Sequence, residues 1–228
     1  MLSLGFPAGA ARVPKTSKAN ERENAVFLIN EILNFSPGRR QEALDRLSYI
    51  HGLMAPSPGF VQALVAKYLG DGVKHTVLRF WESEEAYQKF REGPNGNYGR
   101  NRPEGLYVNE QVVPQWNSLF EEKGSGTGKF LVKVQQPVPE DQWDQFIAMD
   151  KSIQAVVTGL GGLGSAVHFR AKDRSEAMAV VRWQGRDNLE KLLDSPDFAK
   201  IVAPRMAAGG PLPSTMCFEI VSEVGPKS

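Results

Sequence analysis

An internal repeat is the feature that most constrains the fold. The stretch VLRFWESEEAYQKFREGP at 77–94 resembles AVVRWQGRDNLEKLLDSP at 179–196, and Trp81 aligns with Trp183 at a spacing of 102 residues (183 − 81 = 102). Upstream, VFLINEI from Val26 aligns with KFLVKVQ from Lys129 at a spacing one residue longer, which a single loop insertion explains. A repeat of this kind indicates one supersecondary unit that occurs twice, so both halves are expected to share one architecture.

Each copy has the pattern strand, helix, strand, strand, helix, strand, judged from hydrophobic periodicity and from Gly and Pro breaks. In the first copy, strands are predicted at 26–35, 61–69, 75–82 and 106–113, with helices around 44–54 and 84–90. In the second copy, strands are predicted at 130–138, 166–171, 177–183 and 216–224, with helices at 140–157 and 186–208.

This order is that of a ferredoxin-like βαββαβ unit, in which two helices cover one face of an antiparallel sheet. The first strand is apolar on both faces, with Phe27 and Ile29 on one side and Leu28 and Ile32 on the other. Because a monomer rarely exposes a large apolar face, the second unit is expected to cover the bare sheet of the first. The predicted fold class is therefore α+β, two tandem ferredoxin-like units that form a body like a dimeric α/β barrel within one chain.

The domain organisation follows from the repeat and from composition. We predict a flexible N-terminal arm at 1–24, a first repeat at 25–120, a linker rich in Gly and Ser at 121–128, and a second repeat at 129–225. The arm is rich in Gly, Ala, Pro and Ser and has no acidic residue before Glu21, so a mobile arm and a transit-type targeting segment both stay open.

Composition narrows the classes of function. With 27 basic and 26 acidic residues the chain lacks the basic surplus typical of nucleic-acid binders. No apolar run reaches the roughly 18 residues that a membrane span needs. The single cysteine, Cys217, excludes an internal disulfide, is compatible with a reducing, cytoplasmic location, and is interpreted as a small buried residue.

Three stretches carry a resemblance to a known family: FWESEEAYQKF at 80–90, RWQGRDNLEKLLDSPDF at 182–198 and MAPSPGFVQALVAKYL at 54–69. They resemble the antibiotic biosynthesis monooxygenase superfamily of dimeric α/β barrels, over nearly the whole chain from residue 26 to residue 224. The resemblance implies either a cofactor-independent oxygenase or a haem-degrading enzyme. Asn30 matches the strand Asn of the haem-degrading branch. Phe90 and Leu192 replace its helix Trp, and neither copy keeps its His, so the iron ligand is missing.

We therefore expect a monooxygenase that acts on a small apolar or aromatic molecule in a cavity between the two sheets, mainly in the first copy, without metal or cofactor. The expected catalytic residues are Asn30, His75 and Arg79, because an amide and two side chains that share one strand face with Trp81 could stabilise a phenolate or enolate. The expected ligand-binding residues are Trp81, Phe90, His168 and Trp183. The expected partner is a small molecule, and the chain is expected to be a monomer that mimics a dimer, with further dimerisation left open.

Other interpretations remain beside this one. Trp81 is more typical of packing at a strand end than of a ligand contact, and His51 is typical of a hydrogen-bonded core histidine. The match GLGGLG at 159–164 precedes a strand-like segment, so it predicts a helix-ending loop and not a dinucleotide site. The alternative function is a non-catalytic protein that binds haem or another small ligand on the same fold, and a third is a structural protein with a sealed interior.

Overall fold

The computed structural model describes residues 26–98, 103–108, 113–207 and 213–227, so the arm expected at 1–24 lies outside the described residues. The strands are β1 (Phe27–Asn34), β2 (Phe60–Tyr68), β3 (Lys74–Trp81), β4 (Gln115–Lys123), β5 (Phe130–Pro137), β6 (Leu163–Ala171), β7 (Glu176–Trp183) and β8 (Ser214–Val224). The α-helices are α1 (Arg40–Met54), α2 (Glu84–Glu92), α3 (Trp143–Gly159), α4 (Arg186–Leu193) and α5 (Pro196–Ala207), and a short 3₁₀ helix, η1 (Glu140–Gln142), precedes α3.

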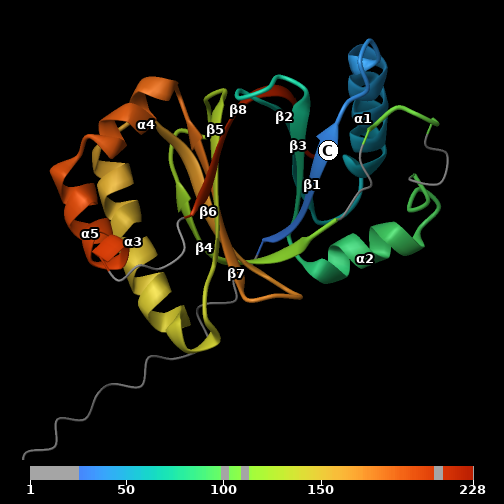
Figure 1. The fold of residues 1–228 in the computed structure, drawn as a ribbon. Coiled ribbons are helices and arrows are strands. Elements are labelled where there is room, and N and C mark those ends of the chain that lie inside the picture. The colour runs from blue at the N-terminus through green and yellow to red at the C-terminus, as the bar shows by residue number, and fades with distance from the viewer. Residues whose placement is uncertain (1–25, 99–102, 109–112, 208–212, 228) are drawn as a thin grey trace, which may run out of the picture.

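The strands close into one barrel in the order β1-β3-β2-β8-β5-β7-β6-β4. Each half keeps the ferredoxin-like order, β4-β1-β3-β2 in the first unit and β8-β5-β7-β6 in the second. The last strand of each unit also pairs with the other unit, β4 with β6 and β8 with β2. Helices α1 and α2 lie on one side of the barrel and α3, α4 and α5 on the opposite side (Figure 1). The predicted α+β tandem of two ferredoxin-like units is confirmed.

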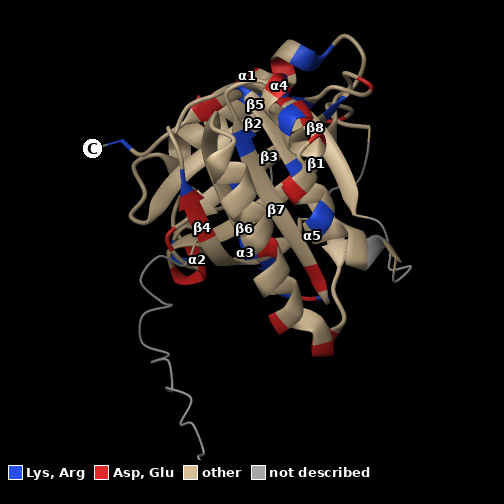
Figure 2. Cartoon of the chain, turned by 90° about the vertical axis from the view of Figure 1, so that its left-hand side faces the viewer, with Lys and Arg blue, Asp and Glu red and all other residues tan. Residues whose placement is uncertain are grey.

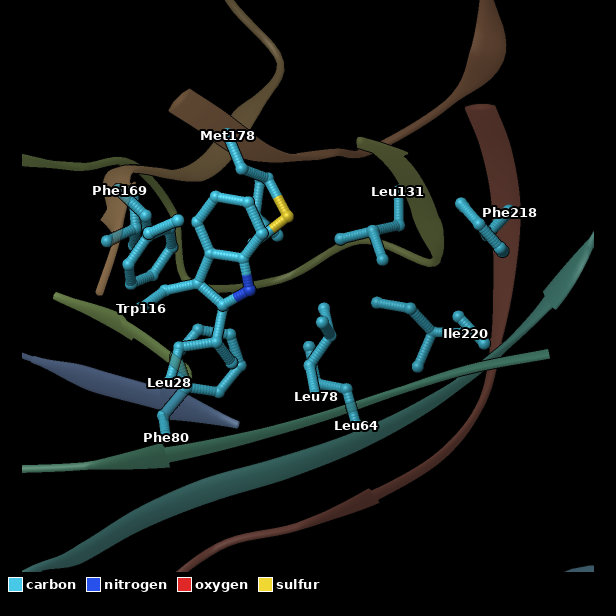
Figure 3. Packing of buried hydrophobic residues seen from close by; sticks show 14 residues of the cluster. Leu28, Leu64, Leu78, Phe80, Trp116, Leu131, Phe169, Met178, Phe218 and Ile220 are labelled. Carbon is cyan, nitrogen blue, oxygen red and sulfur yellow. The ribbon is translucent and has the colours of Figure 1, made fainter. Parts of the chain in front are cut away.

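The barrel interior is filled by apolar side chains from both units (Figure 3). Trp116 of β4 is fully buried and points toward Met178 of β7. Fourteen buried residues form this cluster: Leu28, Leu64, Ala66, Leu78, Phe80, Trp116, Leu131, Val167, Phe169, Ala171, Met178, Val180, Phe218 and Ile220. An eight-stranded barrel is just wide enough for its own side chains to fill it. The space between the two sheets, where we expected the cavity, is therefore a packed core.

The outer faces of the two sheets carry the helices. In the first unit, α2 begins after Ser83, whose side-chain oxygen accepts a hydrogen bond from the backbone N–H of Ala86 at 3.1 Å. Glu84 in the first turn favours the same helix end, because the first backbone N–H groups of a helix attract negative charge. The helix buries Phe90 against Trp81 of β3, with ring centroids 5.3 Å apart. This packing fixes α2 on the outside of the first sheet.

The fourth strand is the main error of the sequence prediction. It was expected at 106–113, but β4 begins after Pro114 and runs to Lys123, through the boundary expected at residue 120 and into the expected linker. Of the expected range, Tyr107 makes an isolated bridge to Phe35, and 109–112 lie outside the described residues. Charged residues such as Glu121 extend the strand because their backbone pairs with β6, with Glu121 opposite Val167. Pairing with the other unit therefore overrides local composition.

The helix expected at 186–208 is two helices, α4 and α5, with a break at Asp194 and Ser195. Pro196 lacks a backbone N–H and so starts a new helix rather than continuing the old one. The side-chain oxygen of Ser195 accepts a hydrogen bond from the N–H of Phe198 at 3.4 Å, which caps α5. The glycine-rich stretch at 159–164 runs from the last residue of α3 into the start of β6, and Gly161 and Gly162 between them have positive φ angles, so the predicted helix-ending loop is confirmed.

Surface charge forms no separate basic face on the side that carries α3 and α5. Figure 2 shows Lys and Arg interspersed with Asp and Glu over these elements. Among the described residues, no helix is long and apolar enough to cross a membrane.

Candidate functional site

The expected catalytic residues of the first unit lie on opposite faces of their sheet. Asn30 of β1 pairs with Leu78 of β3, and its side chain faces the barrel interior, where its Oδ1 accepts a hydrogen bond from the Thr76 hydroxyl at 3.0 Å. On β3, Leu78 faces the barrel interior, and successive side chains of a strand alternate between its two faces. His75 and Arg79 therefore face outward, toward the helices. One ligand therefore cannot touch Asn30 and Arg79 together.

On the helix side of the first sheet, Arg79 belongs to a buried polar network. Its Nη1 lies 3.0 Å from Glu31 Oε2, and its Nε donates a hydrogen bond to His51 Nε2 at 3.2 Å. Burial, helped by the Arg79 charge, lowers the pKa of His51 to about 2, so this imidazole is neutral and accepts the Arg79 hydrogen bond. Arg79 is 1% exposed, and the network occupies the space between β3 and α1.

The other expected residues of the first unit pack against their neighbours. Trp81 contacts Phe60 and Phe90, each with ring centroids 5.3 Å away. His75 stacks on Phe35 with ring centroids 3.9 Å apart, and its Nδ1 lies 2.8 Å from a backbone carbonyl oxygen. Burial lowers the pKa of His75. These contacts favour the packing interpretation of Trp81 and place His75 in the core.

A cavity of about 410 Å³ lies instead in the second unit, between its sheet and the helices α3, α4 and α5. Its floor is formed by outward-facing residues of β5, β6, β7 and β8, and its walls by the three helices. The lining residues are Val132, Val134, Gln136, Phe146, Met149, Asp150, Ile153, Gln154, Val157, His168, Ala177, Ala179, Val181, Trp183, Leu189, Leu192, Leu193, Phe198, Val202, Pro213 and Thr215. Two residues expected to bind ligand, His168 and Trp183, are among them.

The cavity carries one buried polar cluster, centred on His168. The Nδ1 atom of His168 lies 2.5 Å from Asp150 Oδ2, and its Nε2 atom lies 3.2 Å from Gln154 Oε1. Asp150 and Gln154 reach the same imidazole because residues four apart lie on one face of α3. His168 is 3% exposed and Asp150 is 9% exposed, so water screens their interaction weakly.

The first unit contributes to this cluster through strand β4. Phe120 lies opposite His168 in the pairing of β4 with β6, and the two rings stack with centroids 4.2 Å apart. Stacking on one side and two hydrogen-bond contacts at the ring nitrogens together hold the imidazole in a single orientation. The exchange of strands between the units thus helps to build the site.

The cavity exists in the second unit because small side chains stand on its central strand. By the repeat spacing, Ala177 and Ala179 of β7 correspond to His75 and Val77 of β3, and Val181 corresponds to Arg79. In the first unit the larger side chains fill the equivalent space. The site was expected in the first copy, whereas the cavity lies in the second.

Sequence reasoning missed Asp150, Gln154 and Gln136. The spacing of Asp150 and Gln154 on an apolar helix face was a usable signal, since burial of a carboxylate requires a partner. Their partner, His168, is 18 residues from Asp150 along the chain, and only the packing of α3 on β6 brings them together.

The described residues offer neither a cluster of metal ligands nor an activated thiol. Within the described ranges, no group of three or more His, Cys, Asp or Glu residues is placed to hold a metal ion. Cys217 is a half-buried free thiol that packs beside the apolar cluster of the second unit, and burial raises its pKa. A raised thiol pKa opposes formation of the nucleophilic thiolate.

Fold and cavity together define a class of protein, a tandem ferredoxin-like barrel with an apolar, histidine-containing cavity outside its second sheet. Residues 25–95 match the family antibiotic biosynthesis monooxygenase. This match in the first unit supports the expected resemblance to the superfamily, and the second unit has the same fold.

Solved structures extend the likeness to both units. A protein from Fusobacterium nucleatum, provisionally described as a monooxygenase, superposes with a TM-score of 0.74 over 89% of this chain and 95% of its own, at 8% identity. A Lactobacillus acidophilus protein with the same description gives 0.71 over 89% and 97%, at 10% identity. An anthrone oxidase-like protein gives 0.67 over 91% and 96%, at 14% identity. These identities establish the fold alone. No curated protein is significantly similar to the chain.

Proposed function

We propose that the protein is a cofactor-independent monooxygenase that oxidises a small aromatic molecule in the cavity of the second unit. The observation that carries the proposal is His168, a buried imidazole held by Asp150 in a cavity with otherwise mostly apolar walls. The family match of the first unit, and the fold relatives provisionally described as monooxygenases, support the same class of reaction.

The chemistry needs a base and a dry cavity. A ring CH₂ next to a carbonyl, as in anthrones, loses a proton to give an electron-rich enolate that can reduce O₂ itself. His168 accepts that proton, one oxygen atom becomes the new carbonyl, and the other leaves as water after His168 returns the proton. The balance is CH₂ + O₂ → C=O + H₂O, so the substrate supplies every electron. Apolar walls protect the anion from water and strengthen its interaction with the imidazolium.

Asp150 is the positioning residue in this proposal. Its carboxylate accepts the N–H of His168 Nδ1, and Nε2 is the nitrogen proposed to act on the substrate once the Gln154 carbonyl oxygen, an acceptor, has moved away from it. Gln154 occupies Nε2 in the structure, so the substrate must replace that 3.2 Å contact when it binds. A cavity of about 410 Å³ lies within the roughly 300–1,000 Å³ range of small-molecule sites and suits about two or three fused rings.

Oxygen uptake and product formation with anthrone test the proposal. The wild-type protein is expected to convert anthrone to anthraquinone without added metal, flavin or reductant. His168→Gln is expected to lower the rate by roughly 10²–10⁴-fold, the usual contribution of a general base. Asp150→Asn is expected to lower the rate less and to shift its pH profile, which a purely structural role would not do. Loss of activity in His75→Gln with retention in His168→Gln would place the site in the first unit instead.

Haem binding, the alternative expected from the sequence, fits this cavity less well. Its described lining has no Lys or Arg to pair with the haem propionates. Haem titration is expected to leave the Soret band as it is in free haem. A shifted Soret band without any oxidation of anthrone would support the binding protein over the oxygenase.

A further inference from the structure

A second polar group lies in the cavity, away from His168. Gln136 of β5 is 7% exposed and lines the cavity, and its Oε1 has no hydrogen-bond partner among the described residues. A buried polar atom without a partner costs about 1–3 kcal/mol, so such atoms are rare unless something binds them. The side chain faces the cavity, so a ligand is the natural partner.

Gln136 and His168 stand on opposite sides of one strand. Gln136 of β5 pairs with Ala177 of β7, and His168 of β6 pairs with Ala179 of the same strand. Strands lie about 4.8 Å apart, so the Cα atoms of the two polar residues are separated by about 10 Å across the sheet and by roughly 7 Å along it. The methyl groups of Ala177 and Ala179 leave room for a flat ring system between them.

The charges around the cavity limit what can face Gln136. No Lys or Arg is among the described lining residues, and Asp150 is the only carboxylate there, already paired with His168. An anionic group at the Gln136 end would be buried without a counter-charge, which is strongly unfavourable. A hydroxyl is neutral and both donates and accepts, so it satisfies the Gln136 amide in either of its two orientations.

We propose that Gln136 is a specificity-determining residue that selects substrates carrying a neutral hydroxyl at the ring edge opposite the acidic group. The inference rests on the proposed function only in assigning the acidic group, a ring CH₂ or a hydroxyl, to His168. It narrows the substrate class to fused-ring aromatics that carry a hydroxyl at the end opposite the acidic group. A ring system whose acidic group lies at His168 and that lacks this hydroxyl leaves the Gln136 amide buried and unpaired.

Calorimetric binding under anaerobic conditions tests this selection without any turnover. The probes are a naphthalenediol with hydroxyls at opposite ends and the matching mono-naphthol. The wild-type protein is expected to bind the diol at least tenfold more tightly, the difference that one satisfied buried hydrogen bond makes. Gln136→Leu is expected to bind the two probes within about twofold of each other and to bind the mono-naphthol more tightly than wild type does.

Gln135→Leu is the matched control, because Gln135 lies next to Gln136 on β5 but faces the other side of the sheet, where it bonds Glu176. It is expected to keep the preference for the diol. Equal binding of both probes by the wild-type protein, or an unchanged preference in Gln136→Leu, would overturn the inference. A preference for the diol without oxidation of anthrone would overturn the proposed function and leave the role of Gln136 standing.

Discussion

Lys133 gives a quantitative test of the packed barrel interior. Its side chain is 3% exposed on the inner face of β5, and its ammonium nitrogen lies 5.9 Å from the centre of the Phe218 ring. Burial lowers its pKa from 10.5 to about 8, although Glu176 acts in the opposite direction. One pH unit corresponds to about 1.36 kcal/mol, so keeping this ammonium charged in the folded protein costs about 3 kcal/mol at pH 7.

The sign of the pH dependence follows from proton binding. Between pH 8 and pH 10.5 the unfolded chain binds a proton that the folded protein has lost, so this contribution makes the protein more stable as the pH rises. Lys133→Met removes the charge and keeps the shape. We expect the variant to be more stable than wild type by about 2–3 kcal/mol at pH 7, with the difference vanishing near pH 10.5.

Urea unfolding followed by circular dichroism at pH 7 and at pH 10 measures this difference. Lys123→Met is the control, because Lys123 is an exposed lysine at the end of β4, and its effect is expected to be small and independent of pH. A Lys133→Met variant that is less stable than wild type at pH 7 would show that Lys133 is hydrated and the barrel open. A gain that persists unchanged at pH 10 would show that the gain does not come from the buried charge, and it would also refute the reasoning.

Three further predictions concern the two units separately. The pKa of His51 is about 2 in the folded protein and 6.5 in the unfolded chain, so the free energy of unfolding falls as the pH drops below 6.5, by about 3 kcal/mol at pH 4. The variant His51→Gln is expected to reduce this loss, as measured by urea unfolding. Ala179→Leu places a larger side chain on the cavity floor and is expected to weaken naphthalenediol binding at least tenfold in calorimetry, with the thermal midpoint close to wild type. Gln136→Leu removes an unpaired buried amide and is expected to raise the free energy of unfolding by about 1 kcal/mol in urea.

Much of the fold followed from the repeat, because two similar units with apolar sheet faces have few ways to cover each other. The extent of β4 could not be predicted from the repeat. Glu121 lies in a segment whose composition is typical of a linker, but backbone pairing with Val167 holds it in the strand. Backbone pairing between distant segments leaves no local signal in the sequence.

The site was harder to predict than the fold, because alternation along a strand does not give the register between strands. Asn30 pairs with Leu78, and a shift of one residue would have put Asn30 on the same face as Arg79. His168 was identified correctly as a candidate, but its partner Asp150 depends on how α3 packs on β6. The cavity depends on Ala179, a residue that is inconspicuous in sequence.

The position of the ligand site is the central claim, and the three histidines of the chain test it directly. His168 lines the cavity of the second unit, whereas His51 and His75 are buried in the first. Imidazole ¹⁵N–¹H spectra are recorded anaerobically with and without the naphthalenediol, and the His168 signals are assigned with His168→Gln. Selective shifts of the His168 signals are predicted, and shifts of His51 or His75 with His168 unchanged would contradict the account.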